Sequence, residues 1–115
     1  MEKEYLDLQF AENEFYRAYS LALKVAGSNK GTIARVEKIR TESDLKESEL
    51  YIELQSAIKV AEAYASQSVI QADNGKERSD KIEKYIELLR KQYATKKSTV
   101  FDAATIKLRA IALGR

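Results

Sequence analysis

The chain has 115 residues, a third of them charged, and it contains no Cys, His, Pro or Trp. Without Cys and His it lacks the thiolate nucleophile, the usual general base and the commonest metal ligand, which excludes disulfides and most familiar catalytic centres. The length predicts one small domain over residues 1–115. A charged chain with few Gly and no Pro is typical of long, solvated helices.

Charge is distributed unevenly, although the net charge is only +2. Residues 1–75 hold nine Lys or Arg against thirteen Asp or Glu, whereas residues 76–115 hold eleven against five. An acidic front and a basic end can pair within the chain or between subunits, or the basic end can meet a polyanion.

Two features bear on localisation. The first ten residues are polar and acidic, which predicts no secretory signal. No apolar run approaches the roughly 18 residues of a membrane span. We therefore expect a cytoplasmic protein that has no membrane partner.

The first predicted helix covers residues 2–26, where apolar residues recur at helical spacing. Acidic residues in its first turns complement the helix dipole. Gly27 to Gly31 form the first turn, because Gly supplies a left-handed C-cap and the Ser and Asn between favour turns. Thr32 is a suitable N-cap for the next helix.

The second predicted helix covers residues 32–72. Its apolar stripe is interrupted between Arg40 and Glu49 and becomes strong from Leu50. Residues 41–44 (TESD) have the form of a capping box, which predicts a kink or restart there.

The third predicted helix covers residues 79–113 and follows a turn at residues 73–75 (DNG). Its stripe contains a polar gap at residues 95–99, where a continuous seam would have an apolar residue. The gap predicts either a bend or a contact surface. The lysines within it can also extend outward along their apolar stems.

These elements predict an all-α protein: an antiparallel arrangement of three helices, dominated by a long coiled-coil-like helical hairpin. Such thin hairpins bury little surface, so we expect a homo-oligomer. Periodicity does not decide whether the first helix packs on its own hairpin or on another subunit. The residues expected to form the packing or oligomer seam are Leu54, Ile58, Ala61, Ala65, Ile82, Ile86, Leu89 and Val100.

No group of residues in the sequence has the pattern of a nucleophile held by an oriented base, so we expect no enzyme. Helical carboxylate metal sites use Glu-x-x-His pairs, and without His we interpret Glu47, Glu49, Glu53 and Glu62 as a solvated face. We expect no metal, no cofactor and no small-molecule substrate.

The basic end supplies the candidate binding site. A dense belt of cations needs little geometry to neutralise phosphates, and a Tyr within it can stack on a base. The alternatives are a Tyr packed in the core and cations that face the acidic part of the second helix, because a hairpin turning at Asn74 brings Glu53 level with about Lys96. The candidates for nucleic-acid binding are Arg90, Lys91, Tyr93, Lys96, Lys97, Lys107 and Arg109.

Four segments carry a family resemblance: residues 15–19 (FYRAY), the long charged second helix, residues 84–89 (KYIELL), and residues 98–101 (STVF) with 106–107 (IK). Their order resembles small all-helical bacteriophage proteins of the recombination-mediator (UvsY-like) type, chiefly over the last third of the chain. The chain departs from that type in its short turn and its lack of Trp.

The resemblance implies a non-enzymatic oligomer in the host cytoplasm that binds single-stranded DNA and helps to load a recombinase. Lys96, Lys97 and Lys107 would then contact phosphates. The alternative is a structural or scaffolding coiled-coil protein that mediates protein–protein assembly.

Overall fold

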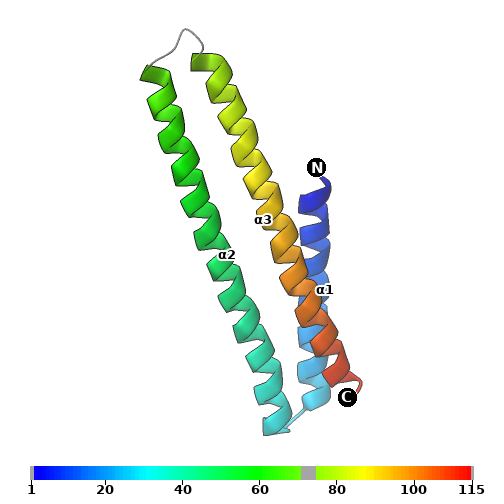
Figure 1. The fold of residues 1–115 in the computed structure, drawn as a ribbon. Helices are drawn as coiled ribbons and strands as arrows, with labels where there is room; N and C mark the ends of the chain where they lie inside the picture. Colours follow the sequence, from blue (N-terminus) through cyan, green and yellow to red (C-terminus); the bar gives the residue numbers. More distant parts are fainter. Residues whose placement is uncertain (1, 71–74, 115) are drawn as a thin grey trace.

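The computed structural model describes residues 2–70 and 75–114, and it contains three helices: α1 (Lys3–Ala26), α2 (Lys30–Ile70) and α3 (Gly75–Ala112) (Figure 1). The prediction of an all-helical chain of three helices is confirmed. In the structure α2 begins two residues, and α3 four residues, before the predicted starts. The predicted end of the second helix at residue 72 and the turn at residues 73 and 74 lie outside the described residues.

The turn between α1 and α2 explains why α2 begins early. Gly27 ends α1 with a φ of 55°, a conformation that Gly adopts without steric cost. Asn29, rather than the predicted Thr32, caps α2: its side-chain oxygen accepts a hydrogen bond from the Thr32 backbone N–H at 3.0 Å. The helix therefore begins at Lys30.

The two polar segments in which the sequence suggested a kink lie inside continuous helices. In α2 the hydroxyls of Thr41 and Ser43 donate to the carbonyls of Glu37 and Ile39, four residues back. In α3 the Ser98 hydroxyl donates to the Ala94 carbonyl in the same way. These hydroxyls bond back along the helix instead of capping a new one, so neither segment interrupts its helix.

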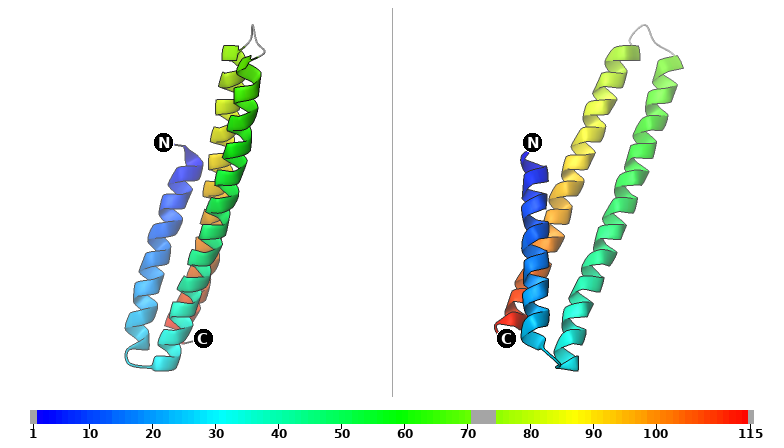
Figure 2. Two further views of the ribbon diagram at one scale, coloured as in Figure 1. Left: turned by 90° about the vertical axis from the view of Figure 1, so that its left-hand side faces the viewer. Right: turned by 180° about the vertical axis from the view of Figure 1, so that it is seen from behind.

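The central helix is α3, because α1 and α2 both pack along it and have few contacts with each other. In Figure 2, α1 and α2 lie close at their connecting turn and diverge away from it. Helices α1 and α3 run in the same direction and α2 runs in the opposite one (Figure 1). The first helix therefore packs on its own chain, which the sequence left open.

The molecule is long and thin, with extents of 67 × 24 × 15 Å. Its radius of gyration is 19.6 Å, against about 13 Å for a compact domain of this length. The described helices include none with the length and apolar character needed to cross a membrane.

The core lies at the end of the molecule where all three helices meet. Phe15 of α1, Val36 of α2 and Leu108 of α3 are its largest fully buried side chains. The Phe15 ring lies 5.1 Å from the ring of Phe101. A row of buried alanines on α1 allows close approach to α3, and it comprises Ala11, Ala18, Ala22 and Ala26.

The predicted seam is only partly buried. Ile58 and Ala61 are buried, whereas Leu54, Ala65, Ile82, Ile86, Leu89 and Val100 are half-buried. Ala65, Ile82 and Ile86 lie beyond the start of α1, where α2 and α3 pack as a pair and two helices leave the flanks of their contact open. Leu54 and Val100 lie level with α1, but they line hollows between α2 and α3. The main core therefore depends on side chains of α1, and the predicted seam contained none of them.

Candidate functional site

The polar gap of α3 is a charge cluster at the junction of the three helices. The Lys97 ammonium lies 2.7 Å from Glu47 of α2 and 3.5 Å from Glu12 of α1. Only 16% of the Lys97 side chain is exposed. One lysine therefore joins both neighbouring helices to α3. The polar gap was predicted to be either a bend or a contact surface. In the structure it is a contact surface, and the contacts are with other helices of the same chain.

Aromatic rings surround this lysine. The Lys97 ammonium lies 5.7 Å from the centroid of the Tyr93 ring and 5.9 Å from that of Phe101, within the range of cation–π attraction. The Tyr93 ring in turn meets Tyr51 of α2 edge-on at 6.4 Å. Tyr93 is thus packed between α2 and α3. This arrangement corresponds to the predicted alternative of a packed Tyr and not to a Tyr exposed for stacking on a base.

Burial and charge shift the pKa values of two groups here. Desolvation lowers the pKa of Lys97, but the hydrogen bond and charge of Glu47, with Tyr93 and Glu12, outweigh it and leave the pKa raised. Burial raises the pKa of Tyr93, against the opposing charge of Lys97. Both groups therefore keep their protons at neutral pH, and neither is poised as a general base.

A second contact ties the start of α1 to α3. The Tyr5 hydroxyl donates a 2.7 Å hydrogen bond to a carboxylate oxygen of Glu87. This bond, followed by burial and the Glu87 charge, raises the pKa of Tyr5 to about 12. The neutral tyrosine is the form that holds the two helices together.

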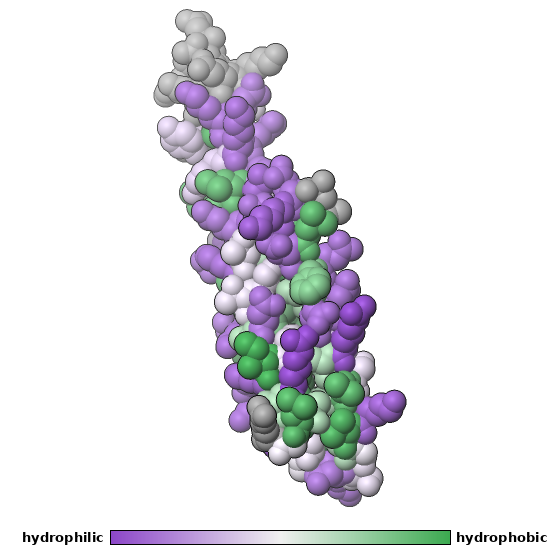
Figure 3. Space-filling model, turned by 90° about the vertical axis from the view of Figure 1, so that its right-hand side faces the viewer, coloured by the Kyte–Doolittle hydropathy of each residue, from purple (hydrophilic) through white to green (hydrophobic). Residues whose placement is uncertain are grey.

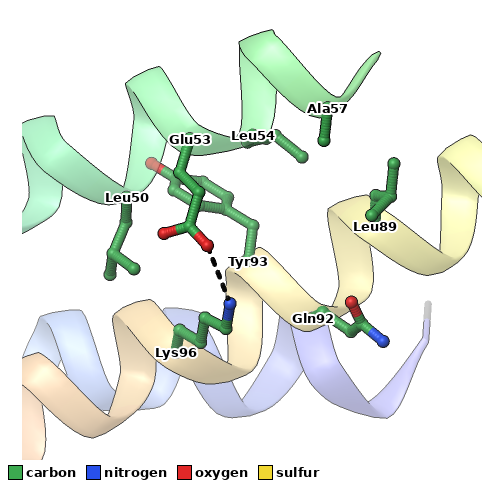
Figure 4. Close-up of a pocket in the computed structure, with 8 residues that line it drawn as sticks. All are labelled: Leu50, Glu53, Leu54, Ala57, Leu89, Gln92, Tyr93 and Lys96. Atoms are coloured by element: carbon green, nitrogen blue, oxygen red, sulfur yellow. Dashed lines mark hydrogen bonds and ion pairs between the residues drawn. The ribbon is translucent and has the colours of Figure 1, made fainter. Parts of the chain in front are cut away.

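Most of the other predicted cations also pair with acidic side chains of the same chain. Lys96 lies 3.5 Å from Glu53 (Figure 4), so the predicted hairpin register is confirmed. Lys91 lies 3.4 Å from Glu2, and Arg109 pairs with Glu14. Four of the seven candidates are therefore bound to carboxylates, of which two lie on α1, two on α2, and one, Glu2, just before α1.

Arg90 and Lys107 have no ion-pair partner among the described residues, and the two lie more than four helical turns apart on α3. The seven candidates consequently do not form one continuous basic face. Glu47, interpreted as part of a solvated face, is only partly solvated, because 32% of its side chain is exposed beside Lys97.

A small hollow between α2 and α3 lies next to the Lys96–Glu53 pair. Leu50, Leu54 and Ala57 of α2 face Leu89 and Tyr93 of α3 around it (Figure 4). It encloses about 50 Å³, whereas sites for small molecules take about 300–1,000 Å³. Taken by itself, this hollow is too small for a substrate.

Towards the end of the molecule at which α1 and α2 connect, the same side of the hairpin carries two hollows that share Ile39, Glu42 and Lys107 and so run together. We call this the basic groove, and the cations that line it are Arg35, Lys38, Lys46 and Lys107. Within the described part of the chain only Lys38 has an ion-pair partner, Glu42 at 4.0 Å.

Of the four cations that line the basic groove, the sequence analysis named Lys107 as a candidate for nucleic-acid binding. It missed the three cations that α2 contributes. The hairpin register contained the missing signal: if Glu53 is level with Lys96, then Glu42 is level with Lys107, and Lys38 and Lys46 lie one turn to either side.

Neither metal-site geometry nor similarity to known proteins assigns a function to these residues. No group of three or more potential metal ligands occurs among the described residues. The chain matches no protein-family model, no curated protein and no solved structure.

Proposed function

We propose that this protein is a non-enzymatic assembly protein, which acts by packing its exposed helix faces against copies of itself. The main support for this proposal is the large solvent-exposed surface of the chain. The folded chain exposes 8125 Å², whereas a folded monomer of 13.1 kDa exposes about 6,400 Å². A surplus of about 1,700 Å² exceeds the roughly 800 Å² per partner that a stable interface buries.

The composition of the exposed surface supports the same proposal. Large apolar side chains lie at least half exposed on all three helices, among them Phe10, Ile52, Val60, Tyr64, Ile106 and Leu113. Contiguous apolar surface on a soluble chain is typical of protein interfaces. In this proposal the antiparallel α2–α3 hairpin is a coiled-coil-like arm whose half-buried seam gains further cover on assembly.

Sedimentation velocity over a concentration series tests the proposal. We expect a defined species larger than the 13.1 kDa monomer, which dissociates on dilution. Because apolar burial drives association, the larger species should persist in high salt. A monomer at every concentration would contradict the proposal.

A second function, binding of single-stranded nucleic acid, is favoured by the basic groove. Arg35, Lys46 and Lys107 line it without acidic partners among the described residues, so they are available to phosphates. The resemblance to phage recombination mediators adds a second proposed partner, a recombinase. In this version the phosphate contacts come from the basic groove, and Lys96 and Lys97 stay in their internal pairs.

Fluorescence anisotropy with a labelled single-stranded oligonucleotide tests this second function. Reversing two groove charges that are unpaired among the described residues, Lys46→Glu with Lys107→Glu, should weaken binding at low salt and reduce the slope of affinity against salt by about two. Lys59→Glu with Lys84→Glu is the matched control, because both lysines are exposed and neither lines the groove. Equal losses in both double variants would contradict a site in the groove.

A further inference from the structure

Helix α1 has apolar side chains on two faces, one buried and one exposed. One face, with Ala11, Phe15 and Ala18, is buried against the other helices. On the outer side Leu6 is 48% exposed, Phe10 67%, Leu21 50% and Val25 53%. A helix that is apolar on both sides is suited to burial between two partners, and within this chain only one side is covered.

The outer face of α1 continues onto α3. Arg109 of α3 reaches Glu14 of α1, so this side of α3 borders α1. Ile106 and Leu113 lie three and four residues from Arg109 on the same side, and both are more than two-thirds exposed. Figure 3 shows apolar side chains gathered on this face of the molecule, most densely towards its lower end.

The outer face of α1 is complementary to itself in the antiparallel direction. Its residues at alternating spacings of three and four are Asp7, Phe10, Glu14, Arg17, Leu21 and Lys24. When two copies of this stripe run antiparallel about their common midpoint, each residue meets a suitable one. Asp7 meets Lys24, Phe10 meets Leu21, and Glu14 meets Arg17, so two apolar layers lie between pairs of opposite charge at the centre and at the ends. Leu6 and Val25 flank these layers.

We propose that a second copy of this chain occupies the outer face of α1, with the two α1 helices packed antiparallel about a two-fold axis. The inference rests on the proposed assembly function and specifies its interface. A two-fold contact requires a surface that is complementary to itself. This stripe meets that requirement, whereas a stripe with charges of a single sign would repel its copy. The Arg17 side chain is 80% exposed, and among the described residues its ion-pair partner is Glu14 of its own helix, which Arg109 also contacts. In the dimer Arg17 then lies opposite Glu14 of the partner subunit.

A mixing experiment tests this geometry. Asp7→Lys alone places two lysines together at both ends of the interface, and Lys24→Asp alone places two carboxylates there. Each variant should therefore self-associate about tenfold or more weakly than the natural chain. When the two variants are mixed, both ends carry opposite charges again, so a heterodimer should form in preference to either homodimer. Native mass spectrometry of the mixture measures this preference.

An apolar double variant tests the same interface by a separate route. Phe10→Ser with Leu21→Ser should abolish association in sedimentation velocity while the circular dichroism and melting curve of the monomer stay unchanged, since both side chains are exposed. Ile52→Ser with Val60→Ser, on the exposed surface of α2, is the control and should leave association intact.

The outcomes separate this inference from the proposed function. If the natural chain is monomeric at all concentrations, both are overturned. If it associates, but the Phe10 and Leu21 variant associates equally well or the charge variants gain nothing on mixing, the chain assembles through another face and the α1 interface is overturned alone.

Discussion

Replacing Phe15 by Ala should lower the free energy of unfolding by about 3–5 kcal/mol, the largest effect that we expect from any single substitution. The Phe15 side chain is 1% exposed and lies where all three helices meet. Its ring contacts Phe101 at 5.1 Å and Tyr19 at 6.4 Å between centroids. Truncation leaves a cavity that the surrounding alanines are too short to fill.

Urea denaturation followed by circular dichroism measures this loss. Ile52→Ala is the control, because Ile52 is 64% exposed on α2 and its truncation should change stability by less than about 0.5 kcal/mol. The result also tests the packing of α1 on its own chain. If the loss disappeared on dilution of an oligomer to monomer, the contact between Phe15 and α3 would be intermolecular, and the core described above would be wrong.

Local signals were sufficient to predict the three helices. Apolar spacing identified each of them, and Gly27 marked the end of α1 to the residue. The start of α2 was misplaced because both Asn29 and Thr32 are good caps, and the choice depends on which side chain reaches a free backbone N–H. The capping-box pattern at residues 41–44 is compatible both with the start of a new helix and with the interior of a continuous one. In the structure the Thr41 and Ser43 hydroxyls donate to carbonyls four residues earlier, so the helix continues.

Contacts between helices were predictable only where a short turn fixed the register. The hairpin turn placed Glu53 beside Lys96, and the ion pair is there. The partners of Lys91 and Arg109, which are Glu2 just before α1 and Glu14 within it, could not be derived, because the small residues of α1 fit many surfaces and do not specify a neighbour. The sequence therefore left open whether the basic belt faces acidic side chains or a polyanion, whereas the structure pairs four of its six cations with carboxylates of the same chain.

The second large effect concerns Lys97. Substitution of Lys97 by Met keeps the apolar stem over the Tyr93 and Phe101 rings but leaves the Glu12 and Glu47 carboxylates without their common cation. Loss of a fully buried pair costs about 3–5 kcal/mol. Because both carboxylates are about one-third exposed and can be hydrated, we expect about 1–3 kcal/mol in urea denaturation.

The neighbouring lysine provides a matched control for Lys97→Met. Lys96 and Glu53 are both more than half exposed, so Lys96→Met should cost less than about 1 kcal/mol. Equal losses at the two positions would contradict the bridging role of Lys97.

The stabilising contribution of Lys97 should also depend on pH. The pKa of Lys97 is raised above its ordinary 10.5, so its contribution is complete below pH 10.5 and is lost as the pH rises through the higher folded value. Above pH 10.5 the natural chain should therefore lose part of its advantage over Lys97→Met, which would not happen if the loss came from packing of the lysine stem.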